Sequence, residues 1–146
     1  MLNYLLIAHL LGATVWTGGH LILSLVILPQ ALRNKELGAL MAFEAQFEKI
    51  GMPAFVLQAL TGVAMIHKML PDVSMWFDTR NDIGLLVSIK LTLLLLTLLV
   101  ALHARFRVIP QLTAARLNFF ALHIVAVTLL GVCFVIVGSL FRTGLG

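Results

Sequence analysis

The stretch IGLLVSIKLTLLLLTLLVALH, residues 83–103, decides the fold of this chain. Lys90 is its single residue among Asp, Glu, Lys and Arg, and its length matches the ~20 residues that a helix needs to cross a lipid bilayer. In hydrocarbon a segment must satisfy its own backbone hydrogen bonds, and a continuous helix does so. The stretch therefore predicts a membrane-spanning helix.

Three further apolar segments extend this prediction to the whole chain. The 146 residues are 61% hydrophobic and 11% charged, with a mean hydropathy of +1.07, which lies outside the range of soluble domains. We predict an all-α integral membrane protein, a four-helix bundle that forms a single transmembrane domain over residues 1–146. Its spans are expected at about residues 2–28, 50–70, 83–104 and 118–141.

The basic residues of the connections indicate how the helices are oriented. Six of them lie after the first span and between the third and fourth spans: Arg33, Lys35, Lys49, Arg105, Arg107 and Arg116. Because such residues accumulate on the cytoplasmic side, both termini are expected on the external side of a bacterial-type inner membrane. The net charge of +4 then indicates contact with anionic membrane lipid rather than with nucleic acid.

Residues 34–50, NKELGALMAFEAQFEKI, interrupt the apolar pattern. Leu40, Phe43 and Phe47 are interspersed there with charged residues, which makes the segment amphipathic. Such a segment either lies along the cytoplasmic interface or extends the second span into water as a helix, since Pro53 is near enough to mark a helical first turn. The sequence leaves both alternatives open.

Five histidines lie within or at the edges of the predicted spans: His9, His20, His67, His103 and His123. The alternating direction of the helices sorts them into an outer pair, His9 and His67, and an inner set of the other three. A helix brings His9 and His20 to nearly the same face, about 16 Å apart along its axis. An unpaired polar group in hydrocarbon costs roughly 2–7 kcal/mol, so these imidazoles are expected to have partners.

Two imidazoles on different helices are the ligands that a low-spin haem iron requires, one from each side of the macrocycle. We therefore predict a membrane b-type cytochrome that holds haem b, two haems in the full arrangement, between its helices. His9 and His67 are expected to ligate the outer haem. His20 and one of His103 and His123 are expected to ligate the inner haem.

Two further residues inside the spans are candidates for contact with this cofactor. Lys90 is a lone cation that needs an anion, either a propionate of the outer haem or a lipid phosphate. Trp16 lies mid-span and packs against either a flat ring or the neighbouring helices. The haems would pass electrons across or at the membrane to a quinone or a redox protein. The sequence leaves open whether the chain is an oxidoreductase in its own right and whether it forms a homo-oligomer.

The segment HLLGATVWTGG, residues 9–19, is similar to the first-helix pattern of the CopD-like membrane proteins and of the related HemJ-type protoporphyrinogen oxidases, which are small four-helix haem proteins. Three further points agree with it: Pro53 and Gly62 in MPAFVLQALTG, Lys90 in IKLTLLLL, and Arg116-Leu117-Asn118 before the fourth span. The resemblance implies a haem near His9 and a role for Lys90.

Two alternative functions follow from this resemblance. A CopD-like copper transport or resistance protein would use soft ligands near the outer end of the second span, where the chain has Met65, His67, Met69 and Met75. A protoporphyrinogen oxidase is the second alternative. Against it, Gln30 stands where the HemJ-type proteins carry an arginine, and Phe119 stands where they carry an acid.

Overall fold

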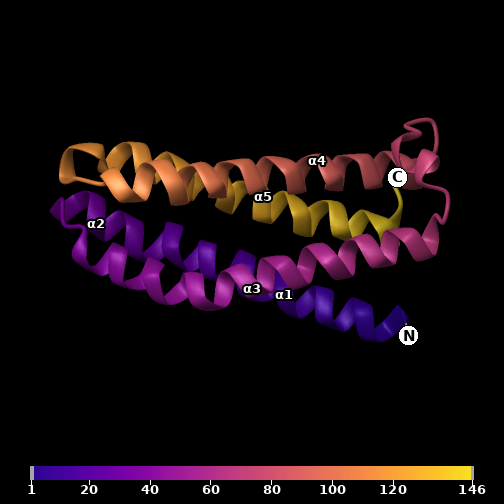
Figure 1. Ribbon diagram of the computed structural model, residues 1–146, viewed down its shortest axis with the longest axis horizontal. Coiled ribbons are helices and arrows are strands. Elements are labelled where there is room, and N and C mark those ends of the chain that lie inside the picture. Colours follow the sequence, from indigo (N-terminus) through magenta and orange to yellow (C-terminus); the bar gives the residue numbers. More distant parts are fainter. Residues whose placement is uncertain (1, 146) are drawn as a thin grey trace.

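The computed structural model describes residues 2–145, which form a bundle of long helices (Figure 1). Each long helix crosses the whole bundle, and short helical segments continue it or lie in the connections. The elements follow in this order: α1 (Leu2–Ile22), the π-helical η1 (Leu23–Ile27), α2 (Leu28–Asn34), α3 (Gly38–Met69), the 3-10 helix η2 (Val73–Phe77), α4 (Asp82–His103), the π-helical η3 (Ala104–Val108), the 3-10 helices η4 (Ile109–Gln111) and η5 (Ala114–Arg116), and α5 (Leu117–Thr143).

Four helical stretches of the described chain are long and apolar enough to cross a membrane: Asn3–Asn34, Gly38–Met69, Asp82–Gln111 and Ala114–Thr143. Their outward faces carry large apolar side chains such as Leu25, Leu60 and Leu122, which are about two-thirds exposed. Such a surface is stable against lipid, where the helices satisfy their own backbone groups. The predicted all-α membrane bundle is therefore confirmed, and the chain is a multi-pass membrane protein.

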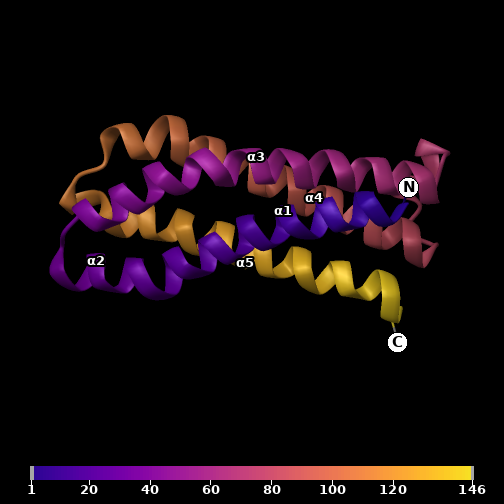
Figure 2. The ribbon, with the colours of Figure 1, turned by 90° about the horizontal axis from the view of Figure 1, so that it is seen from below.

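Both ends of the described chain lie at the same end of the bundle (Figures 1 and 2). The connection from α2 to α3 and the connection from α4 to α5 lie at the opposite end. An even number of spans requires this arrangement. That the termini face the outside of the cell stays a prediction.

Residues 38–50 of the amphipathic segment are a continuous part of the second long helix, because α3 begins at Gly38. Leu40 is fully buried, and Phe43 packs on the same core, which includes Leu23 and Leu117 of the neighbouring helices. The segment is thus a helical extension of the second span, and its apolar face joins the bundle core. The first helix also runs beyond its predicted end, to Asn34, and the chain then turns at Lys35 with a left-handed φ of 54°.

The helices pack as two pairs, since α1 packs most extensively on α3 and α4 packs most extensively on α5. The first pair approaches closely at Gly12, where a Cβ atom would lie 2.8 Å from the carbonyl oxygen of Ala54 and 3.1 Å from the Cβ of Gln58. Small residues permit such close approach between membrane helices. This contact fixes α1 against α3 and leaves the remaining space between the two pairs.

Replacing Gly12 with alanine should therefore separate α1 from α3. We expect Gly12→Ala to lower the free energy of unfolding by about 1–3 kcal/mol, the usual cost of overpacking, and to lower the thermal midpoint in detergent. Gly18→Ala is the matched control, because a Cβ there would meet no described atom within 4 Å outside its local helical backbone. Equal midpoints for the two variants would contradict the close contact.

Candidate functional site

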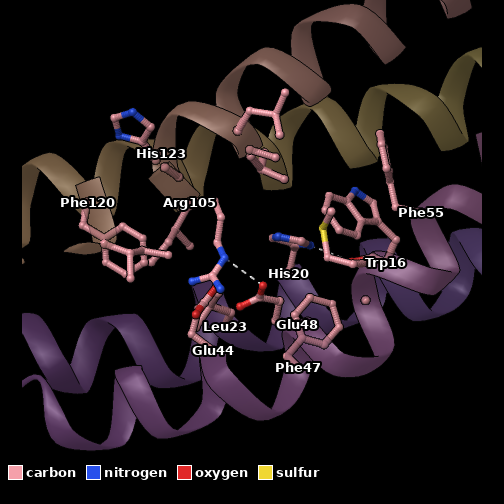
Figure 3. Close-up of a pocket in the computed structure, with 18 of the residues that line it drawn as sticks. Trp16, His20, Leu23, Glu44, Phe47, Glu48, Phe55, Arg105, Phe120 and His123 are labelled. Carbon is pink, nitrogen blue, oxygen red and sulfur yellow. Dashed lines mark hydrogen bonds and ion pairs between the residues drawn. The ribbon is translucent and has the colours of Figure 1, made fainter. Parts of the chain in front are cut away.

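The larger of two cavities that contain histidines has a volume of about 210 Å³ and lies between the two helix pairs (Figure 3). Its walls are mainly apolar and aromatic, with a few polar groups. The aromatic residues are Trp16, Phe47, Phe55, Phe106 and Phe120, and the polar or charged residues are His20, Glu44, Glu48, Arg105 and His123. A mostly apolar lining with a few polar groups is typical of a site for a small molecule or cofactor, and the volume of about 210 Å³ is below the roughly 300–1,000 Å³ usual for such sites.

His20 enters this cavity from α1 in a defined tautomer. Its Nδ1 lies 2.8 Å from the carbonyl oxygen of Trp16, and because a carbonyl oxygen can only accept, Nδ1 carries the proton. The Nε2 atom of the neutral imidazole therefore carries a lone pair. The ring is held by Trp16 at 4.4 Å and by an edge contact with Phe47 at 5.1 Å between centroids. This is the tautomer that a metal-ligating histidine adopts.

Trp16 is 4% exposed and packs on Phe55 as well, with ring centroids 4.6 Å apart. Its indole Nε1 has no hydrogen-bond partner among the described residues. A buried donor without an acceptor costs about 1–3 kcal/mol. Trp16 thus packs against neighbouring rings, and its Nε1–H is a donor without an acceptor among residues 2–145.

A hydrogen-bonded contact ties the His20 region of the first helix to α5. The Thr128 hydroxyl lies 2.6 Å from the Ser24 hydroxyl and 3.1 Å from the carbonyl oxygen of His20. Thr128 is buried, so these bonds form away from solvent. They fix the height of His20 relative to the fourth span.

Figure 3 shows Arg105, Glu44 and Glu48 close together, with Phe120 on one side and Trp16 on the other. The Arg105 Nε atom lies 2.8 Å from a carboxylate oxygen of Glu48, and this ion pair joins η3 to α3. Glu44 lies one turn before Glu48 and lines the same cavity. These charged residues were not predicted from the sequence to be part of a site. Glu44 and Glu48 are four residues apart in the amphipathic segment, and this spacing could have indicated two carboxylates on one face of a helix.

The remaining two members of the inner set contact each other. His103 Nδ1 lies 2.8 Å from His123 Nε2, and His123 Nδ1 lies 2.9 Å from the carbonyl oxygen of Phe119. Because His123 Nδ1 donates to that carbonyl, the other bond runs from His103 Nδ1–H to His123 Nε2. The structure therefore brings His20 and His123 to one cavity. The exposed His103 does not line this cavity, but it is hydrogen-bonded to His123.

The smaller cavity, of about 40 Å³, contains His9 and Lys90. His9 Nδ1 donates to the carbonyl oxygen of Gln58 at 2.8 Å, so its Nε2 carries the lone pair. A Cβ at Gly62 would lie 3.0 Å from the His9 ring, which explains the glycine there. The Oε1 atom of Gln58 has no partner among the described residues. The structure thus brings His9 and Lys90 to the same cavity wall.

His67 does not line this smaller cavity. Its side chain is exposed, and its ring lies 6.5 Å from that of Trp76. His67 follows Gln58 by nine residues, which places it on the opposite face of α3, about 180° away. Ligation of an outer haem by His9 and His67 stays a prediction.

Comparison with models of known protein families finds a match over most of the chain. A family model described as copper resistance protein D matches residues 41–141, which include most of α3 and almost all of α5. No curated protein and no solved structure matches the chain.

Replacing Thr128 with valine should loosen the contact between the first and fourth spans without changing the side-chain shape. We expect Thr128→Val to lower the free energy of unfolding by about 0.6 kcal/mol, a typical value for hydrogen bonds between membrane helices. Thr92→Val is the matched control, because the Thr92 hydroxyl is exposed and bonds to Ser88 of its own helix. A thermal midpoint that falls equally in both variants would contradict the role of Thr128.

Proposed function

The chain belongs to the copper resistance protein D family, and we propose that within this family it binds haem b and carries electrons at the membrane. The carrying observation is the tautomer of His20, whose Nε2 lone pair is available at an aromatic-lined cavity between the helix pairs. Iron of a haem accepts such a nitrogen as an axial ligand. A haem supplies one-electron redox chemistry when bound.

The residues of the larger cavity fit the chemical needs of a haem. Aromatic and aliphatic side chains form most of the cavity lining and suit the faces of a flat macrocycle. The unpartnered Trp16 Nε1 and the Arg105 guanidinium supply donors for acceptor groups such as the carboxylates of the haem. Arg105 already pairs with Glu48, so a carboxylate there would compete with that ion pair.

His20 would bind the haem iron through Nε2, since its own helix supplies the hydrogen bond that orients its ring. His123 lines the cavity from α5, but its Nε2 accepts a hydrogen bond from His103. A second axial bond from His123 would replace that hydrogen bond. We propose a quinone or a redox protein as the electron partner and the bacterial inner membrane as the location.

Copper handling is the second candidate function, and the description of the family favours it. Among residues 2–145, no group of three or more His, Cys, Asp or Glu side chains comes together as a metal site. His67, Met69 and Met75 near the end of α3 are exposed. The described residues thus do not fit a copper site built from three or four such ligands.

The haem proposal predicts that His20→Ala removes most of the haem from the protein. The measurement is the absorption spectrum of protein purified in detergent, with haem counted per chain after extraction. Added imidazole should restore haem binding in His20→Ala by replacing the lost ligand, which separates ligand loss from misfolding. Thr92→Val is the control, because Thr92 is exposed and does not line the cavity. Full haem content in His20→Ala would refute the assignment.

A further inference from the structure

Lys90 is a cation inside the third span, and it forms no ion pair within residues 2–145. It lines the smaller cavity, and none of the six acidic residues of the chain does so. Its Nζ atom lies 5.7 Å from the centroid of the Phe141 ring. A lone charge inside a membrane span is costly, and such residues commonly belong to a functional site. Lys90 therefore needs an acceptor from a bound molecule.

Gln58 brings the opposite requirement to the same cavity. Its side chain lines the cavity from α3 and is only 6% exposed, and its Oε1 atom has no partner among the described residues. His9 adds a second acceptor, since its Nδ1–H already donates to the carbonyl oxygen of Gln58 and its Nε2 carries the lone pair. The cavity thus offers one cationic donor and two acceptors to a ligand.

The position and size of the cavity limit which part of a ligand can enter. It lies between α3 and α4, which approach each other at few points. Val63 of its wall is exposed on the outside of the bundle, so the cavity lies near the lipid. Its volume of about 40 Å³ has room for about three water-sized groups, which suits a hydroxyl group and the adjoining edge of a ring. The apolar remainder of such a ligand would stay between the two helices.

We propose that the smaller cavity binds the hydroxyl-bearing edge of a lipid-soluble quinol, the reduced form of a quinone. The quinol oxygen accepts a hydrogen bond from the Lys90 ammonium group, and its hydrogen is donated to Gln58 Oε1 or His9 Nε2. A lipid phosphate diester or a fatty-acid carboxylate would pair with Lys90 but has no hydrogen for Gln58. A quinone likewise only accepts. The site is therefore selective for the reduced form.

The choice of a redox-active ligand rests on the proposed function, in which a quinone is one of the electron partners. Phe55 lines both cavities, so the bound quinol lies next to the site proposed for the haem. Binding of the quinol itself uses no residue of the haem assignment, which depends on His20. A quinol bound to His9 leaves this histidine unavailable to an outer haem.

The test is an oxygen-free binding titration of the purified protein in detergent with decylubiquinol and, separately, with decylubiquinone. We expect one quinol per chain, bound at least tenfold more tightly than the quinone. Gln58→Leu should remove this preference, because leucine keeps similar bulk without the acceptor. Lys90→Met should weaken the binding of both forms at least tenfold. Thr92→Val is the matched control, because Thr92 is exposed, lies two residues from Lys90 and does not line the cavity.

Equal affinity of the unmodified protein for the two forms would overturn the proposal, as would an unchanged quinol preference in Gln58→Leu. Displacement of the quinol by added phosphatidylglycerol would overturn it as well, because Lys90 would then serve a lipid phosphate. Haem content measured on the same preparations separates the two proposals. A Lys90→Met protein that keeps its haem and loses the quinol supports the quinol site, whereas loss of its haem would overturn that site. Retention of haem in His20→Ala would overturn only the haem proposal.

Discussion

The hydrogen bond from His20 Nδ1–H to the carbonyl oxygen of Trp16 is the interaction on which the larger cavity depends. It uses the single proton of the neutral ring within the same helix, one turn back, and so lowers the cost of a polar side chain in an apolar span. His123 repeats this arrangement with the carbonyl oxygen of Phe119, also four residues earlier. His9 achieves it across helices, with Gln58 of α3 as the acceptor. In all three rings Nε2 carries the lone pair; in His123 this lone pair accepts a hydrogen bond from His103, whereas in His20 it is available to a metal.

The close packing of α1 on α3 at Gly12 decides where open space remains in the bundle. Because each pair packs tightly within itself, the larger cavity forms between the pairs, at the level where η1 and η3 interrupt the regular α-helices. π-helical turns of this kind occur frequently at functional sites. Here η1 begins three residues after His20, and η3 carries Arg105 to the cavity wall. The irregular turns and the cavity are thus parts of one arrangement.

Apolar length and the alternating direction of the helices were enough to predict the bundle. The predicted depths put His20, His103 and His123 at one level and Lys90 near His9; in the structure His20 and His123 line one cavity, and His9 and Lys90 line another. Their binding of haem stays a prediction. The face of α3 on which His67 lies was not predicted. Counting 100° per residue from Gln58 would have placed His67 on the opposite face of this helix. The ion pair of Glu48 with Arg105 could not be predicted, because the π-helical turn shifts the register of every later residue. The burial of Leu40 likewise depends on the partner surface rather than on the local pattern.

The measurement that tests the proposed site most directly is a crystal structure of the protein after haem has been added. We expect a planar cofactor between the α1–α3 pair and the α4–α5 pair, with its iron bonded to His20 Nε2 and the His20 bond to the Trp16 carbonyl oxygen retained. The aromatic residues that now line the cavity should contact the macrocycle. A larger cavity filled by lipid chains, or a haem bound elsewhere with His20 unliganded, would contradict the proposed site.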